Sequence, residues 1–200
     1  LARMAEFARK HGVRLRPHAK MHKSAALARL QMQAGAVGVC VQKTDQALAL
    51  AQAGAHDILI TNEVIAPQKL RRLAQAVRDL PTRFGLVVDS ELGVARLADA
   101  LAEAGVRGEH RIDVYIEIDV GHGRCGVPAG EAAVVLAHSI LANPVLHFAG
   151  LQAYHGAAQH RRNPAERAQA IGEAAWTAAL ARERLQASGF NSRTNSPHWR

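Results

Sequence analysis

The fold class of this 200-residue chain follows from one stretch, DILITNEVIAPQKLRRLAQAVRDLPTRFGLVVD, which spans residues 57–89. The stretch begins with a short apolar run at 57–61, continues with a helical pattern at 67–79, and ends with a second apolar run at 84–89. Pro67 favours the first turn of a helix, because its fixed φ suits that position and its missing amide hydrogen is not needed there. We therefore predict a strand–helix–strand unit with parallel strands.

The same alternation continues on both sides of this stretch, with β-rich apolar runs separated by Ala-, Leu- and Arg-rich stretches of helical period. The expected strands are 13–17, 37–41, 57–61, 84–89, 114–120 and 148–153. The expected helices are 24–33, 44–53, 67–79, 91–104, 131–142 and 164–188. Gly35, Gly54 and Gly105 stand where helices should end. About six βα units predict an α/β protein, either a doubly wound sheet or a partial (β/α)8 barrel that lacks two units.

The composition limits the possible functions. Hydrophobic residues make up 48% of the chain and charged residues 21%, which is typical of a globular protein. No run of 18 apolar residues occurs, so we expect no membrane-spanning segment. Cys40 and Cys125 form neither a disulfide framework nor a metal-ligand spacing, which favours a reducing cytoplasm.

The net charge of +8 raises the possibility of a nucleic-acid partner. The basic residues are spread along the whole chain, however, and only four Phe, two Tyr and two Trp are available for base stacking. We therefore expect no nucleic-acid partner, and the charge fits an anionic small ligand such as a phosphate equally well.

Polar side chains follow the end of each predicted strand. They are His18 and Lys20, Gln42, Asn62 and Glu63, Asp89, Asp119 with Arg124, and Tyr154 with His155. The carboxyl ends of parallel strands share one edge, and this edge carries the active site in α/β folds. Polar groups at six strand ends predict a lined pocket.

Two other readings of these residues are rejected. GHGRCG at 121–126 satisfies the glycine pattern of a dinucleotide site, but Pro128 delays the helix and no acidic residue follows about 20 positions later. His18 and His22 have the spacing of a helical zinc pair, but Pro17 predicts a turn and no Glu lies between them. We predict neither a NAD site nor a metal ligand in this chain.

Lys20 is the strongest candidate for covalent chemistry. A desolvated lysine near other cations becomes a nucleophile toward aldehydes. The positive or potentially positive neighbours Arg16, His18, His22 and Lys23 disfavour the charged form of Lys20. Lys23 is expected in the first turn of the following helix, facing solvent.

Several motifs resemble one enzyme group in the right order. RPHAKMHK at 16–23 resembles the cofactor-lysine motif of the D-threonine aldolase and D-serine dehydratase group, whose barrel is the alanine racemase N-terminal fold. EIDVGHGRCGV at 117–127 and GLQAYHGAAQH at 150–160 resemble two further motifs of the group. CVQKTDQA at 40–47 and ITNEV at 60–64 match its intervening strand ends.

The resemblance implies a role for individual residues. Lys20 would hold pyridoxal 5'-phosphate through a Schiff base, and Arg124 would donate to the phenolic oxygen of the cofactor. Tyr154 and His155 would lie against the cofactor ring, and His160 would be the general base of the aldolase branch. Gln42 and Asn62 are cofactor-site candidates by position alone.

The resemblance also implies an activity, cleavage of D-threonine-like D-β-hydroxy amino acids to glycine and an aldehyde. The alternatives are a D-serine or 3-hydroxyaspartate dehydratase of the same family and a non-catalytic pyridoxal-phosphate barrel. The domain expected at 1–190 is incomplete at both ends, and 191–200 is a tail outside the family pattern. A divalent metal (Mn, Mg or Zn) and a homodimer are expected only in the complete protein, whose C-terminal metal domain is missing here.

Overall fold

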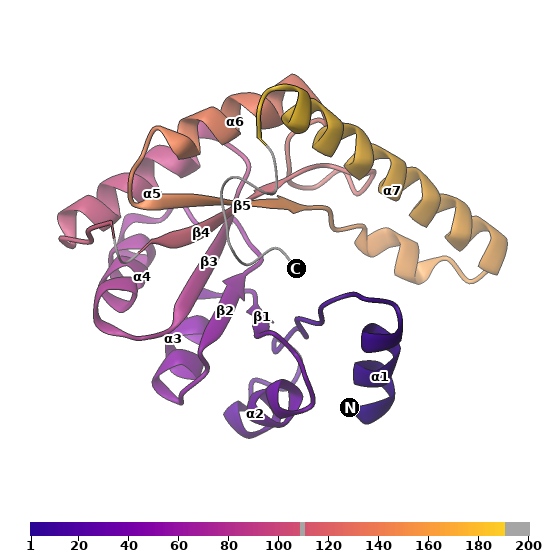
Figure 1. Ribbon diagram of the computed structural model, residues 1–200, viewed down its shortest axis with the longest axis horizontal. Coiled ribbons are helices and arrows are strands. Elements are labelled where there is room, and N and C mark those ends of the chain that lie inside the picture. The colour runs from indigo at the N-terminus through magenta and orange to yellow at the C-terminus, as the bar shows by residue number, and fades with distance from the viewer. Residues whose placement is uncertain (109–110, 191–200) are drawn as a thin grey trace.

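The computed structural model describes residues 1–108 and 111–190 as a curved parallel sheet with helices along its outer side (Figure 1). The strands are β1 (Val39–Val41), β2 (Asp57–Ile60), β3 (Arg83–Val88), β4 (Ile112–Glu117) and β5 (Leu146–Gln152). The helices are α1 (Ala2–Lys10), α2 (Ala25–Gln33), α3 (Thr44–Gln52), α4 (Pro67–Asp79), α5 (Glu91–Glu103), α6 (Glu131–Leu141) and α7 (Pro164–Ala187), with the 3-10 helix η1 (Gly156–His160) before α7. The alternation predicted from residues 57–89 is therefore confirmed.

The strand order decides between the two predicted architectures. Neighbours run β1-β2-β3-β4-β5 without a reversal, and each pair is parallel. A doubly wound sheet reverses its strand order at a switch point, whereas a barrel adds each strand to the same side. The order is that of a (β/α)8 barrel. Within the described residues β1 and β5 are both edges, so the barrel is not closed.

Local sequence signals set the helix boundaries. Pro67 and Pro164 occupy the first turn of α4 and α7, as predicted. Ser24 caps α2 by accepting a hydrogen bond from the amide of Leu27, and Ser90 caps α5 through the amide of Gly93. The predicted terminating glycines Gly35, Gly54 and Gly105 all adopt positive φ just after their helices.

The main core lies between the outer face of the sheet and the helices. Each of the strands β1 to β4 contributes fully buried side chains to this core, for example Val39, Ile58, Leu86 and Ile116. Because side chains alternate along a strand, the intervening residues face the inside of the barrel. Cys40, Leu59 and Val87 form a second, smaller cluster with Tyr115 on that inner face.

The prediction of a first strand at 13–17 was wrong. None of these residues belongs to a strand, and the isolated bridge to β1 lies just after them, where His18 pairs with Cys40. The amide of Cys40 donates to Pro17 (2.8 Å) and the amide of Ala19 donates to Cys40 (2.7 Å). The next rung, between Arg16 and Gly38, would need an amide hydrogen from Pro17, which proline lacks. The sheet thus has five strands where six were expected.

Charged residues fill the amino-terminal layer of the inner face. Arg16 forms an ion pair with Asp57 next to Gly38, where a Cβ atom would lie 2.8 Å from the guanidinium of Arg16. Asp113 accepts hydrogen bonds from Arg83 (2.5 Å) and from His147 (2.7 Å). Gly38 is therefore required for space, since any larger side chain would displace the first of these pairs.

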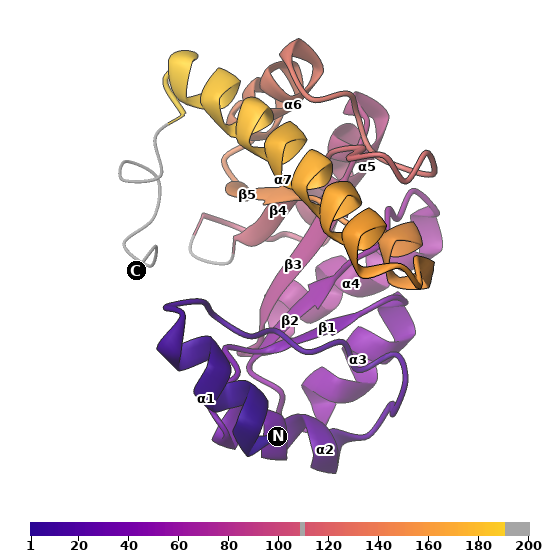
Figure 2. The ribbon, with the colours of Figure 1, turned by 90° about the vertical axis from the view of Figure 1, so that its right-hand side faces the viewer.

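The ends of the curved sheet are covered differently. Figure 2 shows α1 and α2 beside β1 at one end, and α6 and α7 at the other. Through residues 1–108 and 111–190, no helix combines the length and the apolar character needed to cross a membrane. The predicted tail, 191–200, lies outside the described residues.

Candidate functional site

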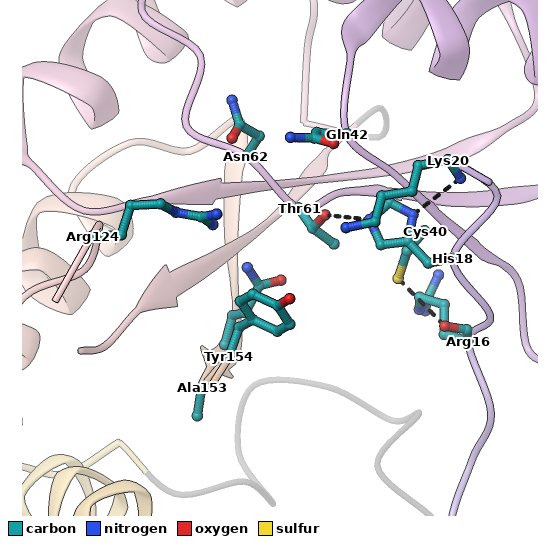
Figure 3. A pocket seen from close by; sticks show the side chains of 11 residues that line it. Arg16, His18, Lys20, Cys40, Gln42, Thr61, Asn62, Arg124, Ala153 and Tyr154 are labelled. Carbon is teal, nitrogen blue, oxygen red and sulfur yellow. Dashed lines mark hydrogen bonds between the residues drawn. The ribbon is translucent and has the colours of Figure 1, made fainter. Parts of the chain in front are cut away.

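A cavity of about 300 Å³ opens at the carboxyl edge of the strands (Figure 3). Its wall brings together side chains from both edges of the sheet and from the loop after β4. The lining residues are Arg16, His18, Lys20, Cys40, Gln42, Thr61, Asn62, Arg124, Gln152, Ala153 and Tyr154. The predicted pocket therefore exists at the predicted edge.

Four of the six predicted site residues share this cavity: Lys20, Gln42, Arg124 and Tyr154. Asn62, proposed by position, lines it as well. In Figure 3 Lys20 and His18 lie on one side of the cavity, and Arg124 and Tyr154 lie on the other. An amine and a guanidinium thus face the same space from different elements, although they are far apart in the sequence.

His18 connects the lysine segment to β2. Its Nδ1 accepts a hydrogen bond from the backbone amide of Lys20 (3.3 Å), and its Nε2 lies 3.1 Å from the hydroxyl of Thr61. The Thr61 hydroxyl donates to the carbonyl of Val41 (3.1 Å), so it accepts from His18. Burial and the charge of Lys20 lower the pKa of His18, which agrees with a neutral ring that donates through Nε2 alone.

The residues after Lys20 form a turn before α2, so His18 and His22 do not share a helix face. The turn predicted at this position is confirmed. Lys23 is exposed, as expected, but it precedes α2 with φ 49° and is not in its first turn. Of the two lysines in the motif, only Lys20 lines the cavity.

Arg124 and Tyr154 form the opposite wall. The guanidinium carbon of Arg124 lies 5.8 Å from the centroid of the Tyr154 ring, within the range of a cation–π contact. A Cβ atom at position 156 would lie 2.6 Å from the Tyr154 hydroxyl, so Gly156 leaves the room that this ring occupies. Tyr154 as a whole is 38% exposed, which leaves part of its surface available to a ligand.

The other two predicted residues lie apart from the cavity wall. His155 is half-buried, its ring centroid lies 6.4 Å from that of His122, and its Nδ1 is buried without a partner among the described residues. His160 ends η1 on the surface, where it lines a separate polar hollow with Gln159 and Arg161, Arg162 and Arg167. The roles of both histidines stay predictions.

Several lining residues were not predicted from the sequence. Thr61, Cys40 and Gln152 lie inside or directly after strands, and only strand alternation with a correct register could have assigned them to the inner face. Burial raises the pKa of Cys40 to about 11, so its thiol stays protonated. Gln152 donates a short hydrogen bond to the carboxyl group of Glu117, which lies buried behind the cavity.

Glu117 is the most perturbed acid near the cavity. Burial raises its pKa to about 7, against the opposing effect of the hydrogen bond from Gln152. The negative charge of Glu63 raises the pKa further, and the positive charge of Arg124 lowers it. Near neutral pH this carboxyl group therefore exists in both protonation states.

Glu63, Asp89 and Cys125 are a group of three in residues 1–108 and 111–190 whose ligand atoms lie within 4.8 Å of one another. Each already has another interaction. The Cys125 thiol hydrogen-bonds to Glu63, and the carboxylate of Asp89 accepts from the amide of Gly126 (3.2 Å). These contacts leave further acceptor sites on both carboxylates, so the three residues remain a candidate ligand group for a cation.

Comparisons with known proteins identify the family. Residues 1–198 match the family described as alanine racemase, N-terminal domain. The chain belongs to this family. The D-threonine aldolase of Arthrobacter sp is 42% identical over 190 residues, which cover 95% of this chain and 48% of that protein. The 3-hydroxy-D-aspartate aldolase of Paracoccus denitrificans (strain Pd 1222) is 44% identical over 161 residues, or 80% of this chain and 40% of that protein.

Solved structures agree with this assignment. The D-threonine aldolase from Filomicrobium marinum superposes with a TM-score of 0.90 at 41% identity, over 95% of this chain and 50% of that one. The D-threo-3-hydroxyaspartate dehydratase from Delftia sp. HT23 gives 0.81 at 30% identity, over 94% and 48%. The chain spans about half the length of the relatives it matches. The resemblance noted in the sequence is confirmed.

Proposed function

We propose that this protein is a pyridoxal-phosphate-dependent lyase that cleaves D-β-hydroxy amino acids of the D-threonine type to glycine and an aldehyde. The observation that carries the proposal is the meeting of Lys20 with Arg124 and Tyr154 in one cavity. The aldolase relatives are 42% and 44% identical to the chain, which supports the same branch.

The cavity fits the cofactor in size and in chemistry. A volume of about 300 Å³ lies at the lower end of the range for small-molecule sites. Among the described residues of the wall, Lys20 is the only lysine, Arg124 offers a planar donor for a phenolic or phosphate oxygen, and Tyr154 offers an aromatic face. When bound, pyridoxal phosphate supplies an electron sink for the pair left by a broken bond at Cα.

The protein's own residues would act on position and on protons. The His18–Thr61 bond fixes the backbone that carries Lys20, so the amine starts from a defined place. Arg124 would orient the ligand oxygen that it contacts. We retain His160 as the base that takes the proton of the substrate hydroxyl, and this role requires η1 to approach the cavity.

The dehydratase branch is the second candidate, because the D-threo-3-hydroxyaspartate dehydratase of Delftia sp. (strain HT23) is 32% identical over 195 residues. The two branches give different products from the same hydroxy amino acid. Glycine and an aldehyde identify an aldolase, whereas a 2-oxo acid and ammonia identify a dehydratase. A chain that binds the cofactor and releases neither set of products would be a non-catalytic carrier.

Two expectations concern the complete protein. We propose that it forms a homodimer and that a divalent metal takes part in its chemistry. Among the described residues Glu63, Asp89 and Cys125 are a candidate ligand group, and no step of the reaction is assigned to a metal there.

The proposal is tested by trapping the cofactor. The full chain is incubated with pyridoxal phosphate, reduced with borohydride and digested, and the modified lysine is located by mass spectrometry. We expect the label on Lys20, its loss in Lys20→Ala, and no change in the matched control Lys23→Ala. A label on Lys23, or capture that survives Lys20→Ala, would refute the assignment.

The assignment of His160 needs a separate test. In a chain completed with the family's C-terminal domain, His160→Ala should keep the trapped label on Lys20 and lower D-threonine cleavage by roughly 10²–10⁴-fold, the usual effect of removing a positioned general base. His56→Ala, which removes a histidine before β2, is the control. Loss of the label with normal turnover of the remaining loaded protein would make His160 a cofactor-site residue.

A further inference from the structure

We propose that Asp119 is a positioning residue, whose carboxylate oxygen holds the 119–127 loop in the one shape that presents Arg124 to the cavity. The inference rests on the proposed function, in which Arg124 contacts the cofactor. It assigns a role to a residue that does not itself line the cavity.

The tip of the loop is built around a single oxygen atom. Oδ1 of Asp119 accepts hydrogen bonds from three successive backbone amides, those of Gly121 (2.9 Å), His122 (2.9 Å) and Gly123 (3.0 Å). The hydrogen bonds from these amides, that of Gly123 most of all, lower the pKa of Asp119. Burial raises it, but by less, so the pKa lies below its ordinary value. The carboxylate therefore stays ionised and keeps its full acceptor strength at neutral pH.

The base of the loop is held differently. The amide of Val127 donates to the carbonyl of Glu117 (3.0 Å), and the amide of Asp119 donates to the carbonyl of Val127 (2.9 Å). A Cβ atom at Gly126 would lie 2.7 Å from the Asp119 amide nitrogen, so the two limbs touch backbone to backbone. Removing the Asp119 side chain would leave this base closed and would release only the tip.

The tip needs such an anchor because its sequence is flexible. Gly121 and Gly123 adopt φ angles of 103° and 67°, in the left-handed region that glycine enters freely and leaves as freely. Ordering each residue of the tip costs conformational entropy. Three hydrogen bonds to one carboxylate oppose this cost along the residues directly before Arg124.

The position of Arg124 depends on that order. Arg124 follows Gly123 directly, and its guanidinium carbon lies 5.8 Å from the Tyr154 ring centroid. His122, held by the same carboxylate, packs edge-on against Tyr154 with ring centroids 5.6 Å apart. One side chain thus fixes both the guanidinium and the imidazole that pack against the aromatic ring of the cavity.

The competing explanation is that Asp119 affects cofactor binding through its negative charge alone and does not hold the loop. The variant Asp119→Asn separates this explanation from the positioning role. Asparagine keeps an acceptor oxygen at the same place and loses the charge, whereas Asp119→Ala loses both. Asp99→Ala, on the exposed side of α5, is the matched control for the loss of one carboxylate.

Two measurements on the full chain test the proposal. The first is the rate at which trypsin cuts between Arg124 and Cys125, followed by mass spectrometry, which reports loop opening without any cofactor. The second is the affinity for pyridoxal phosphate. We expect Asp119→Ala to be cut at least about 10-fold faster and to bind the cofactor about 10- to 100-fold more weakly, as for a lost charge-assisted hydrogen bond. Asp119→Asn keeps an acceptor oxygen that is weaker because it is neutral, so it should lie between the wild type and Asp119→Ala in both measurements.

The outcomes are distinguishable. Unchanged cleavage in Asp119→Ala, or equal damage in Asp119→Asn and Asp119→Ala, would overturn the positioning role. A wild-type chain that takes up no pyridoxal phosphate would overturn the proposed function instead, and the trypsin rates would still decide whether Asp119 holds the loop.

Discussion

The Nε2 atom of His18 and the hydroxyl oxygen of Thr61 lie 3.1 Å apart and join the lysine segment to β2. The segment has only one bridge to β1, because Pro17 cannot donate to a second rung. A side-chain hydrogen bond therefore does part of the work that a continuous strand ladder would do. The backbone amide of Lys20 donates to the same imidazole, so this bond also helps to fix the position of Lys20.

Thr61→Val tests this connection. The variant removes the hydroxyl that accepts from His18 and donates to Val41, so partly buried groups lose their partners. We expect the free energy of unfolding to fall by about 1–2 kcal/mol and the capture of pyridoxal phosphate on Lys20 to weaken. Urea denaturation measures the first effect. Thr177→Val removes a hydroxyl that bonds to its own helix and is the control. Equal losses in the two variants would contradict the prediction.

Asp113→Asn tests the charged layer at the amino-terminal end of the sheet. Asp113 is 8% exposed and accepts from both Arg83 and His147. Because Arg83 is partly solvated, we expect a loss of about 2 kcal/mol in the free energy of unfolding, less than for a fully buried pair. Asp79→Asn, in the exposed pair with Arg78, should change nothing measurable.

The same variant has a defined pH signature. Burial alone would raise the pKa of Asp113, but the hydrogen bonds from His147 and Arg83 outweigh it, and the pKa lies below its usual 3.8. A depressed folded pKa adds stability above the unfolded value, and this stability is lost as the pH falls through the folded pKa. The acid limb of the stability curve below about pH 4 should therefore be less steep in Asp113→Asn. Parallel acid limbs would contradict the shift.

The sequence predicted the sheet because its strands are buried on their outer face and rich in Val, Ile and Leu, as the runs at 57–61 and 84–89 show. The sequence wrongly predicted a first strand, because Val13 and Leu15 have high strand propensity. Propensity does not take into account that Pro17 has no amide hydrogen to donate to the backbone beside β1. The carboxyl-edge rule predicted that Lys20 and Arg124 would meet. The inner face stayed hidden, because assigning Thr61 or Glu117 to it requires the register of each strand.

The need for tertiary information also explains why Tyr154 and His160, predicted from the motif at 150–160, lie apart. Tyr154 lies just after the end of β5 and lines the cavity, whereas His160 is the last residue of η1 and lies on the surface. Sequence spacing places a residue on a loop, but the path of the loop depends on tertiary packing. The fold of a short segment such as 156–160 is decided by contacts that no local pattern contains.

The two thiols should react at different rates with iodoacetamide. Burial raises the pKa of both thiols, that of Cys40 to about 11, but Cys40 is buried whereas Cys125 is only half-buried and so more accessible. The thiolate is the reactive form, so at pH 8 we expect alkylation of the native chain at Cys125 first. Cys125→Ser should remove the faster phase, and urea should expose Cys40. Equal labelling of both cysteines in the native chain would show that the Cys40 site opens.

Glu117→Gln tests the buried carboxyl group behind the cavity. Its pKa is about 7 in the folded chain and 4.5 is its ordinary value, so between these values the folded chain holds a proton that the unfolded chain releases. A raised folded pKa gives stability that is complete below the unfolded value and is lost as the pH rises through the folded one. One pKa unit corresponds to about 1.4 kcal/mol, so the loss over the whole pH range reaches at most about 3.5 kcal/mol.

Glutamine cannot ionise, and its amide can still form a hydrogen bond with Gln152. We therefore expect the difference in unfolding free energy between Glu117→Gln and the wild type to shift in favour of the variant from pH 5 to pH 8, by up to about 3 kcal/mol. Urea denaturation at several pH values measures this shift, and Glu103→Gln at the exposed end of α5 is the control. Only the change with pH is decisive, because a constant offset reports the altered hydrogen bond. A difference that stays constant across this range would mean that Glu117 ionises as an ordinary glutamate, and that burial beside Gln152 and Arg124 does not hold its proton.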